Sequence, residues 1–96
     1  AGNVLDEHVI GSIEYAVKQY DIPLVVVLGH SDCGAIASTI NACRDPNKVL
    51  PENLQQIVDD IKPTVIEVYE NNKTAALDEI STLAIKENAV NIVSEL

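Results

Sequence analysis

The sequence predicts an α/β protein in which helices flank a mostly parallel sheet. Apolar residues recur at helical spacing before and after position 30, which indicates amphipathic helices. Between them, the run "LVVVL" from Leu24 to Leu28 is apolar at every position. Such a run is typical of a strand buried on both faces, as in a parallel sheet covered by helices. Gly29 follows this strand, and a helical segment begins a few residues later.

Size and composition narrow the classes of protein that this chain can be. It has 96 residues, enough for one domain and one modest core, so we assign residues 1–96 to a single domain. The net charge of −9 argues against nucleic acid and against anionic membranes as partners. Two cysteines do not make a disulfide framework, so we expect a reducing, cytoplasmic environment. No apolar run approaches the roughly 20 residues of a membrane span.

The first helix is predicted from Leu5 to about Tyr20. Asn3 or Asp6 is positioned to cap it, and Pro23 disfavours helical geometry just after it. The apolar residues expected to face inward are Val9, Ile13, Ala16, Val17 and Tyr20.

Three further helical segments are predicted after the strand. The first runs from about Cys33 to Ala42, before a polar loop with turn residues. The next begins near Pro51, is broken or kinked at Pro63, and resumes through Tyr69. Residues 73–96 form one last helix or two. The residues expected to face inward in the last two segments are Leu54, Ile57, Val58, Ile61, Leu77, Ile80, Leu83 and Ala84.

A single strand raises a physical difficulty. Its N–H and C=O groups need partner strands, and no second strand is evident in the sequence. Three explanations remain open. A strand is misread as helix, the sheet is completed by residues outside these 96, or a partner chain completes it.

His30 and Cys33 are the candidate metal ligands. Gly29 allows a sharp turn out of the strand, and ligand sites in open α/β sheets lie at this end of strands. Cys33 falls at the first turn of the following helix, and a thiolate and an imidazole can bind one tetrahedral Zn²⁺. Two other interpretations remain open. Cys33 is a buried apolar residue beside a hydrogen-bonded His30, or Cys33 is a nucleophile with His30 as its base.

Other polar residues have simpler interpretations. Cys43 is expected to be structural, because a helix separates it from Cys33 by roughly 15 Å. His8 is expected on the surface of the first helix. Asp32 is expected to cap the second helix, with support of a metal ligand as the alternative.

Three blocks of the sequence resemble the β-class carbonic anhydrases. They are "AGN" at the start, "SIEYAV" from Ser12 to Val17, and "GHSDCGAI" from Gly29 to Ile36. The segment "ENAVNIVSEL" near the end is similar to the family's helix before its closing strands. The resemblance implies that His30 and Cys33 are two of three protein ligands to a catalytic zinc. It also implies an α/β fold around a mostly parallel sheet and an obligate homodimer or higher oligomer.

The chain departs from the family in one important way. The family's Cys-x-Asp-x-Arg segment, which carries another zinc ligand, is not in this sequence, and the chain contains no Met. We therefore expect an incomplete β-carbonic-anhydrase-like domain, a third protein ligand outside these residues, and no activity from the 96 residues alone. No further catalytic residue is assigned.

For the parent protein, the resemblance implies zinc-dependent reversible hydration of carbon dioxide to bicarbonate. The alternatives are a non-catalytic relative without a complete zinc site, and a sibling hydrolase acting on carbonyl sulfide or carbon disulfide.

Overall fold

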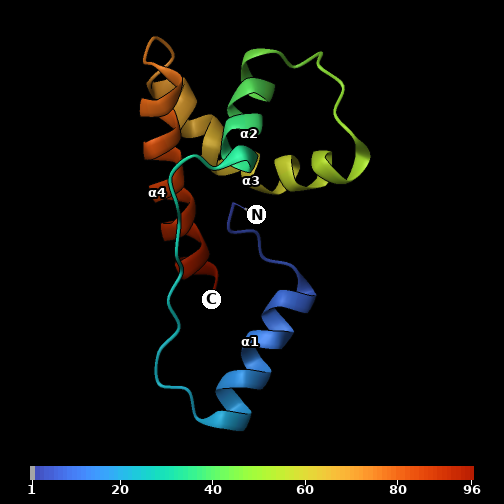
Figure 1. Cartoon of the computed structure of the whole chain (residues 1–96), viewed down its shortest axis with the longest axis vertical. Coiled ribbons are helices and arrows are strands. Elements are labelled where there is room, and N and C mark those ends of the chain that lie inside the picture. The colour runs from blue at the N-terminus through green and yellow to red at the C-terminus, as the bar shows by residue number, and fades with distance from the viewer. Residues whose placement is uncertain (1) are drawn as a thin grey trace.

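The computed structural model describes residues 2–96, which form four helices in the order α1, α2, α3 and α4 (Figure 1). Their bounds are Glu7–Tyr20 for α1, Gly34–Arg44 for α2, Glu52–Asn71 for α3 and Leu77–Glu95 for α4. Helices α2, α3 and α4 pack on one another in all three pairs, whereas α1 packs on none of them. The molecule is therefore elongated, with extents of 46 × 26 × 19 Å, and α1 lies at the end opposite α2 (Figure 1).

The core lies between α2, α3 and α4. Apolar residues spaced three or four apart on each helix meet there, because this spacing places them on one helix face. Ile40, Ile61 and Ile80, one from each helix, are at most 1% exposed. The other buried residues of this cluster are Cys33, Ile36, Val65, Val68 and Ala84.

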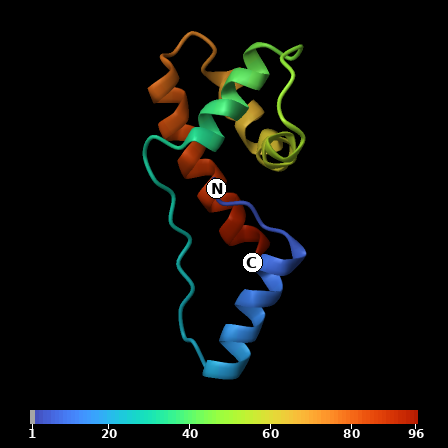
Figure 2. The same ribbon diagram turned by 45° about the vertical axis from the view of Figure 1, so that its right-hand side comes forward.

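Helix α3 continues through Pro63 without interruption. A proline inside a helix removes one backbone hydrogen bond and crowds the preceding turn, which bends the helix. The two views show α3 changing direction along its length (Figures 1 and 2). The predicted kink is thus confirmed and the predicted break is wrong. Pro51 precedes α3 as its N-cap residue.

The buried face of α4 contains one polar residue. Ile80, Ala84, Asn88 and Ile92 follow one another at intervals of four and are all buried. This stripe faces the core at its start and the N-terminal residues of the chain further along, where Asn88 contacts Gly2 and Asn3.

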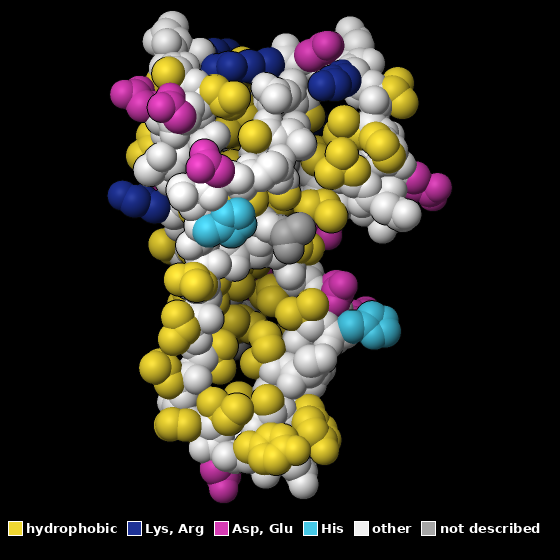
Figure 3. All heavy atoms as spheres, viewed as in Figure 1, with side chains coloured by type: hydrophobic (Ala, Val, Ile, Leu, Met, Phe, Trp, Pro, Cys, Tyr) yellow, Lys and Arg dark blue, Asp and Glu magenta, His cyan; other side chains and the backbone are white. Residues whose placement is uncertain are grey.

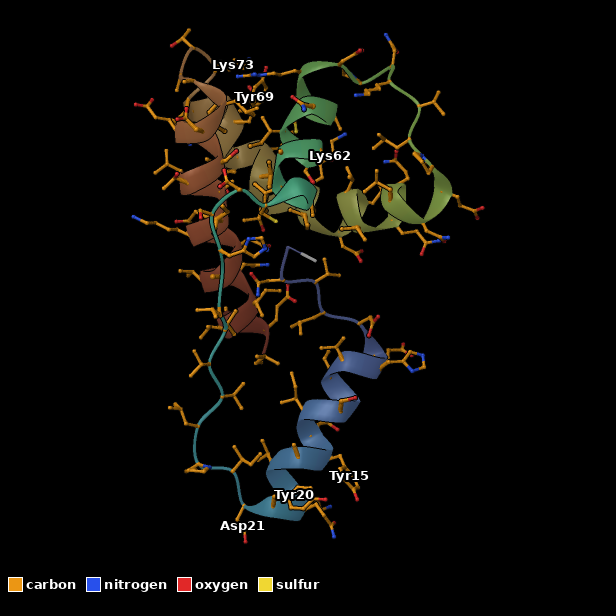
Figure 4. All side chains as sticks on the ribbon, viewed as in Figure 1. Tyr15, Tyr20, Asp21, Lys62, Tyr69 and Lys73 are labelled. Atoms are coloured by element: carbon orange, nitrogen blue, oxygen red, sulfur yellow. The ribbon has the colours of Figure 1, made fainter. Side chains whose placement is uncertain are left out.

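Helix α1 is capped as the sequence predicts but is not buried. The Asp6 carboxylate accepts a hydrogen bond from the Val9 amide at 2.8 Å, which confirms Asp6 as the N-cap. No residue of α1 is buried. Tyr20, expected to face inward, is 69% exposed and packs edge-on against Tyr15 at the far end of the helix (Figure 4). Leu77 and Leu83 of α4 are likewise more exposed than predicted.

The predicted α/β fold is wrong for this structure, because residues 2–96 contain no strand and no sheet. The segment from Leu24 to Leu28 instead runs as an irregular connection between α1 and α2 (Figure 1). Leu24, Val26 and Leu28 are 70–77% exposed. A strand requires neighbouring backbone to accept and donate its ladder hydrogen bonds, and the described residues supply none here. An apolar run therefore predicted a buried strand whose partners the described chain lacks.

No helix in the described part of the chain is both long enough and apolar enough to cross a membrane.

Packing of α2 against α3 and α4 predicts a large effect of truncating its core. Ile40→Ala removes most of a side chain with 0% exposure, so we expect the free energy of unfolding to fall by about 2–5 kcal/mol. Denaturant unfolding followed by helical circular dichroism measures this change. Val49→Ala, at a position 92% exposed, is the control, and equal effects of the two substitutions would contradict the described core.

Candidate metal centre

The turn from Leu28 to Cys33 connects the irregular segment to α2. The side-chain amide of Asn3 donates to the Leu28 carbonyl at 3.1 Å, which fastens the start of this turn. Gly29 lies against α4, since a Cβ built on it would lie 2.7 Å from Cγ2 of Ile85. Asp32 has a left-handed backbone with φ of 53°, which completes the turn into the helix.

His30 is exposed, and one of its ring nitrogens makes a hydrogen bond. Its Nδ1 lies 2.7 Å from the Ser31 carbonyl oxygen. A carbonyl oxygen only accepts, so Nδ1 carries the proton and donates to it. In the neutral ring this leaves Nε2 with a free lone pair, the form in which a histidine binds a metal.

Cys33 lies at the junction between the turn and the core. It is the N-cap residue of α2 and only 6% exposed, and its carbonyl accepts the Ala37 amide at 3.0 Å. Gly2 lies close to it, because a Cβ built on Gly2 would lie 3.8 Å from the Cys33 Sγ. The start of α2 is the end of the helix where negative charge is favoured.

His30 and Cys33 line one narrow crevice. The other residues that line it are Gly2, Asn3, Ile36, Ile85 and Asn88. An imidazole nitrogen and a thiol sulfur together match the ligands that zinc prefers, so the donors present fit this metal. Within residues 2–96, no group of three or more His, Cys, Asp or Glu side chains could hold a metal ion. This part of the chain thus brings two candidate ligands together and not three.

Cys43 lies at the opposite end of α2, as predicted, and does not line the crevice. It is half-buried, and this burial raises the pKa of its thiol, an effect that the charge of Lys62 opposes and that of Glu70 reinforces. Lys62 extends from α3 beside α2 (Figure 4). A thiol whose pKa is raised stays protonated at neutral pH, which disfavours metal binding.

The two other candidates, His8 and Asp32, are both exposed. His8 is exposed on α1, as predicted. Asp32 precedes the N-cap residue Cys33, and no side-chain hydrogen bond caps α2, so the predicted capping role is wrong. Asp32 is exposed and lines a hollow beside α4 that Asp78 and Thr82 also line.

Asn88 was not among the residues that the sequence singled out. It is 3% exposed, and its side chain reaches the crevice that His30 and Cys33 line. A signal for it exists in the sequence, since Ile80, Ala84 and Ile92 make an apolar stripe that only Asn88 interrupts. A polar residue within a buried stripe indicates a hydrogen-bonding partner on the facing segment.

Comparison with known proteins places these features in a family. A family model described as carbonic anhydrase matches residues 1–96. A carbonic anhydrase of Mycolicibacterium smegmatis is 44% identical over 66 residues, which cover 69% of this chain and 32% of that protein. Carbonic anhydrase 2 of Mycobacterium tuberculosis is 43% identical over 67 residues, which cover 69% of this chain and 31% of that protein. The chain thus spans about a third of the length of these curated relatives. It belongs to the carbonic anhydrase family, in its prokaryotic β class.

Proposed function

We propose that the protein to which this chain belongs interconverts carbon dioxide and bicarbonate at a zinc site that includes His30 and Cys33. The observation that carries this proposal is the crevice lined by both side chains at the start of α2. Family membership supports the reaction class. We retain a cytoplasmic location as part of the same proposal, since both cysteines are free thiols.

In this proposal the residues of the chain orient two ligands. The Ser31 carbonyl holds the His30 ring through Nδ1 and leaves Nε2 to bind the metal. Burial in the core holds Cys33, so its sulfur has a defined position before any metal arrives. When bound, zinc supplies Lewis-acid chemistry that makes water a competent nucleophile near neutral pH.

The third protein ligand is proposed to come from outside residues 2–96, either from further sequence of the same chain or from a partner subunit. Two ligands leave two of four zinc positions to water, which is a weak site for a metal. A complete catalytic zinc site has three protein ligands and one open position.

Ligand substitutions in the complete natural protein test this function. We expect about one zinc per chain and rapid carbon dioxide hydration in the wild type. His30→Ala and Cys33→Ser should each lose both the tightly bound zinc and the hydration of carbon dioxide, because each removes one of the proposed protein ligands. Elemental analysis and stopped-flow hydration provide the two measurements, and Cys43→Ser is the matched thiol control that should keep both.

Full zinc occupancy in both ligand variants would refute the site. A wild type that binds zinc but does not hydrate carbon dioxide would refute the activity. That second result would favour the alternative of a non-catalytic relative or of a hydrolase for a related substrate.

We also propose that the protein is a homodimer or a higher homo-oligomer. The exposed apolar side chains of α1 and of the Leu24–Leu28 segment support this, because soluble monomers rarely expose so continuous an apolar surface. These side chains gather over the end of the molecule that carries α1 (Figure 3).

A charge placed within this surface should weaken the assembly. Val26→Glu introduces a carboxylate at a side chain 70% exposed, and we expect sedimentation to show smaller particles than the wild type forms. Val49→Glu, in the loop between α2 and α3, should leave the oligomer intact. A wild type that sediments as a monomer would contradict the proposed assembly.

A further inference from the structure

We propose that Asn88 is a positioning residue for the metal centre, because its side chain holds the N-terminal segment, which borders Cys33 and is hydrogen-bonded to the turn that carries His30. The inference rests on the proposed zinc site and adds a residue that acts through backbone hydrogen bonds and not by touching the metal. Asn88 lies on α4, which contributes no ligand of its own.

The side chain of Asn88 uses both hydrogens of its amide on the N-terminal segment. Its Nδ2 donates to the Gly2 carbonyl and, at 3.1 Å, to the Asn3 carbonyl. An amide nitrogen has two hydrogens to donate, so neither is left over. Asn88 is also 3% exposed, so water cannot replace it as a partner for these two carbonyls.

The first connection leads from Asn88 to Cys33. Gly2 is buried in a confined space, since a Cβ built on it would lie 2.7 Å from Ile61 Cδ1 and 3.8 Å from the Cys33 Sγ. The bond from Asn88 therefore holds backbone that borders the sulfur.

The second connection leads from Asn88 to His30. Asn88 holds the backbone of Asn3, and the Asn3 side chain donates to the Leu28 carbonyl at 3.1 Å. Leu28 lies two residues before His30, at the start of the turn. Asn88 is thus joined to both halves of the crevice, although 55 or more residues separate it from them in sequence.

The backbone of the N-terminal segment needs this support. Gly2 and Asn3 both have left-handed backbones, with φ of 64° and 57°. Asn3 tolerates this conformation better than most residues other than glycine, but it is still uncommon, and surrounding contacts favour it where it occurs. Two hydrogen bonds from a buried amide provide such contacts.

Removal of the Asn88 amide should weaken zinc binding measurably. Partners that orient metal ligands are typically worth roughly 10–100-fold in metal affinity. Asn88 acts one step further from the metal, so we expect zinc to bind about tenfold more weakly, at the lower end of that range, when its amide is removed.

The experiment compares Asn88→Ala with Asn72→Ala in the complete natural protein. Asn72 is a matched control, because its Nδ2 also donates to a carbonyl, that of Val68 at 2.9 Å, far from the crevice at the end of α3. Zinc affinity is measured by competition with a chelator, and the absorption spectrum of the cobalt-substituted protein reports ligand geometry. We expect Asn88→Ala to bind zinc about tenfold more weakly and to shift the cobalt spectrum, whereas Asn72→Ala changes neither.

A readout without metal separates this inference from the proposed function. Nuclear magnetic resonance order parameters of the backbone amides of residues 28–33 in the metal-free protein should be lower in Asn88→Ala than in Asn72→Ala. If the wild type binds no zinc and Asn88→Ala still has the lower order parameters, the zinc site is refuted and the role of Asn88 in holding the turn stands. Unchanged order parameters, or unchanged zinc affinity and cobalt spectrum in a folded Asn88→Ala, would overturn the proposal.

A milder variant covers the case in which Asn88→Ala does not fold. Asn3→Gly keeps the left-handed backbone accessible and removes only the bond to the Leu28 carbonyl. We expect lower amide order parameters at residues 28–30 in this variant. Order parameters equal to those of the wild type would refute the connection from Asn88 to His30.

Discussion

The packing of α2 against α3 and α4 is the constraint on which the rest of the structure depends. Ile40, Ile61 and Ile80 meet there almost without exposure, and Cys33 belongs to the same buried cluster. Apolar packing therefore holds the Cys33 side chain. His30 lies outside this cluster on an exposed turn, so hydrogen bonds must hold it instead. One candidate ligand is fixed by the core and the other by polar contacts.

Helix α4 links these two modes of support. Its early turns contribute Ile80 and Ala84 to the core, and one turn later the same face presents Asn88 to the N-terminal segment. Ile85, on a neighbouring face, lies against Gly29 and leaves no room for a side chain there. The turn that carries His30 is thus confined between α4 and Asn3. By contrast, α1 and the Leu24–Leu28 segment are held by few contacts and expose much of their apolar surface.

Local features of the structure could be predicted from the sequence, but its tertiary arrangement could not. Helical spacing located all four helices, Asp6 was one of the two caps predicted for the first, and Cys43 was separated correctly from Cys33. The α/β prediction was wrong because an apolar run says how much surface a segment should bury, and not whether partner backbone is present to pair with it. The apolar stripe that Asn88 interrupts indicates a polar contact, but its partners are backbone carbonyls 85 and 86 residues away, and no local pattern identifies them.

The state of the His30 ring in the zinc-loaded protein tests the central claim most directly. Nuclear magnetic resonance of nitrogen-15-labelled histidine distinguishes a protonated ring nitrogen from a metal-bound one, and His8 provides an internal reference on exposed α1. The account predicts that Nδ1 of His30 keeps its proton, donated to the Ser31 carbonyl, and that zinc shifts the Nε2 resonance alone. Zinc binding through Nδ1, or zinc binding that leaves both ring nitrogens of His30 unchanged, would contradict it.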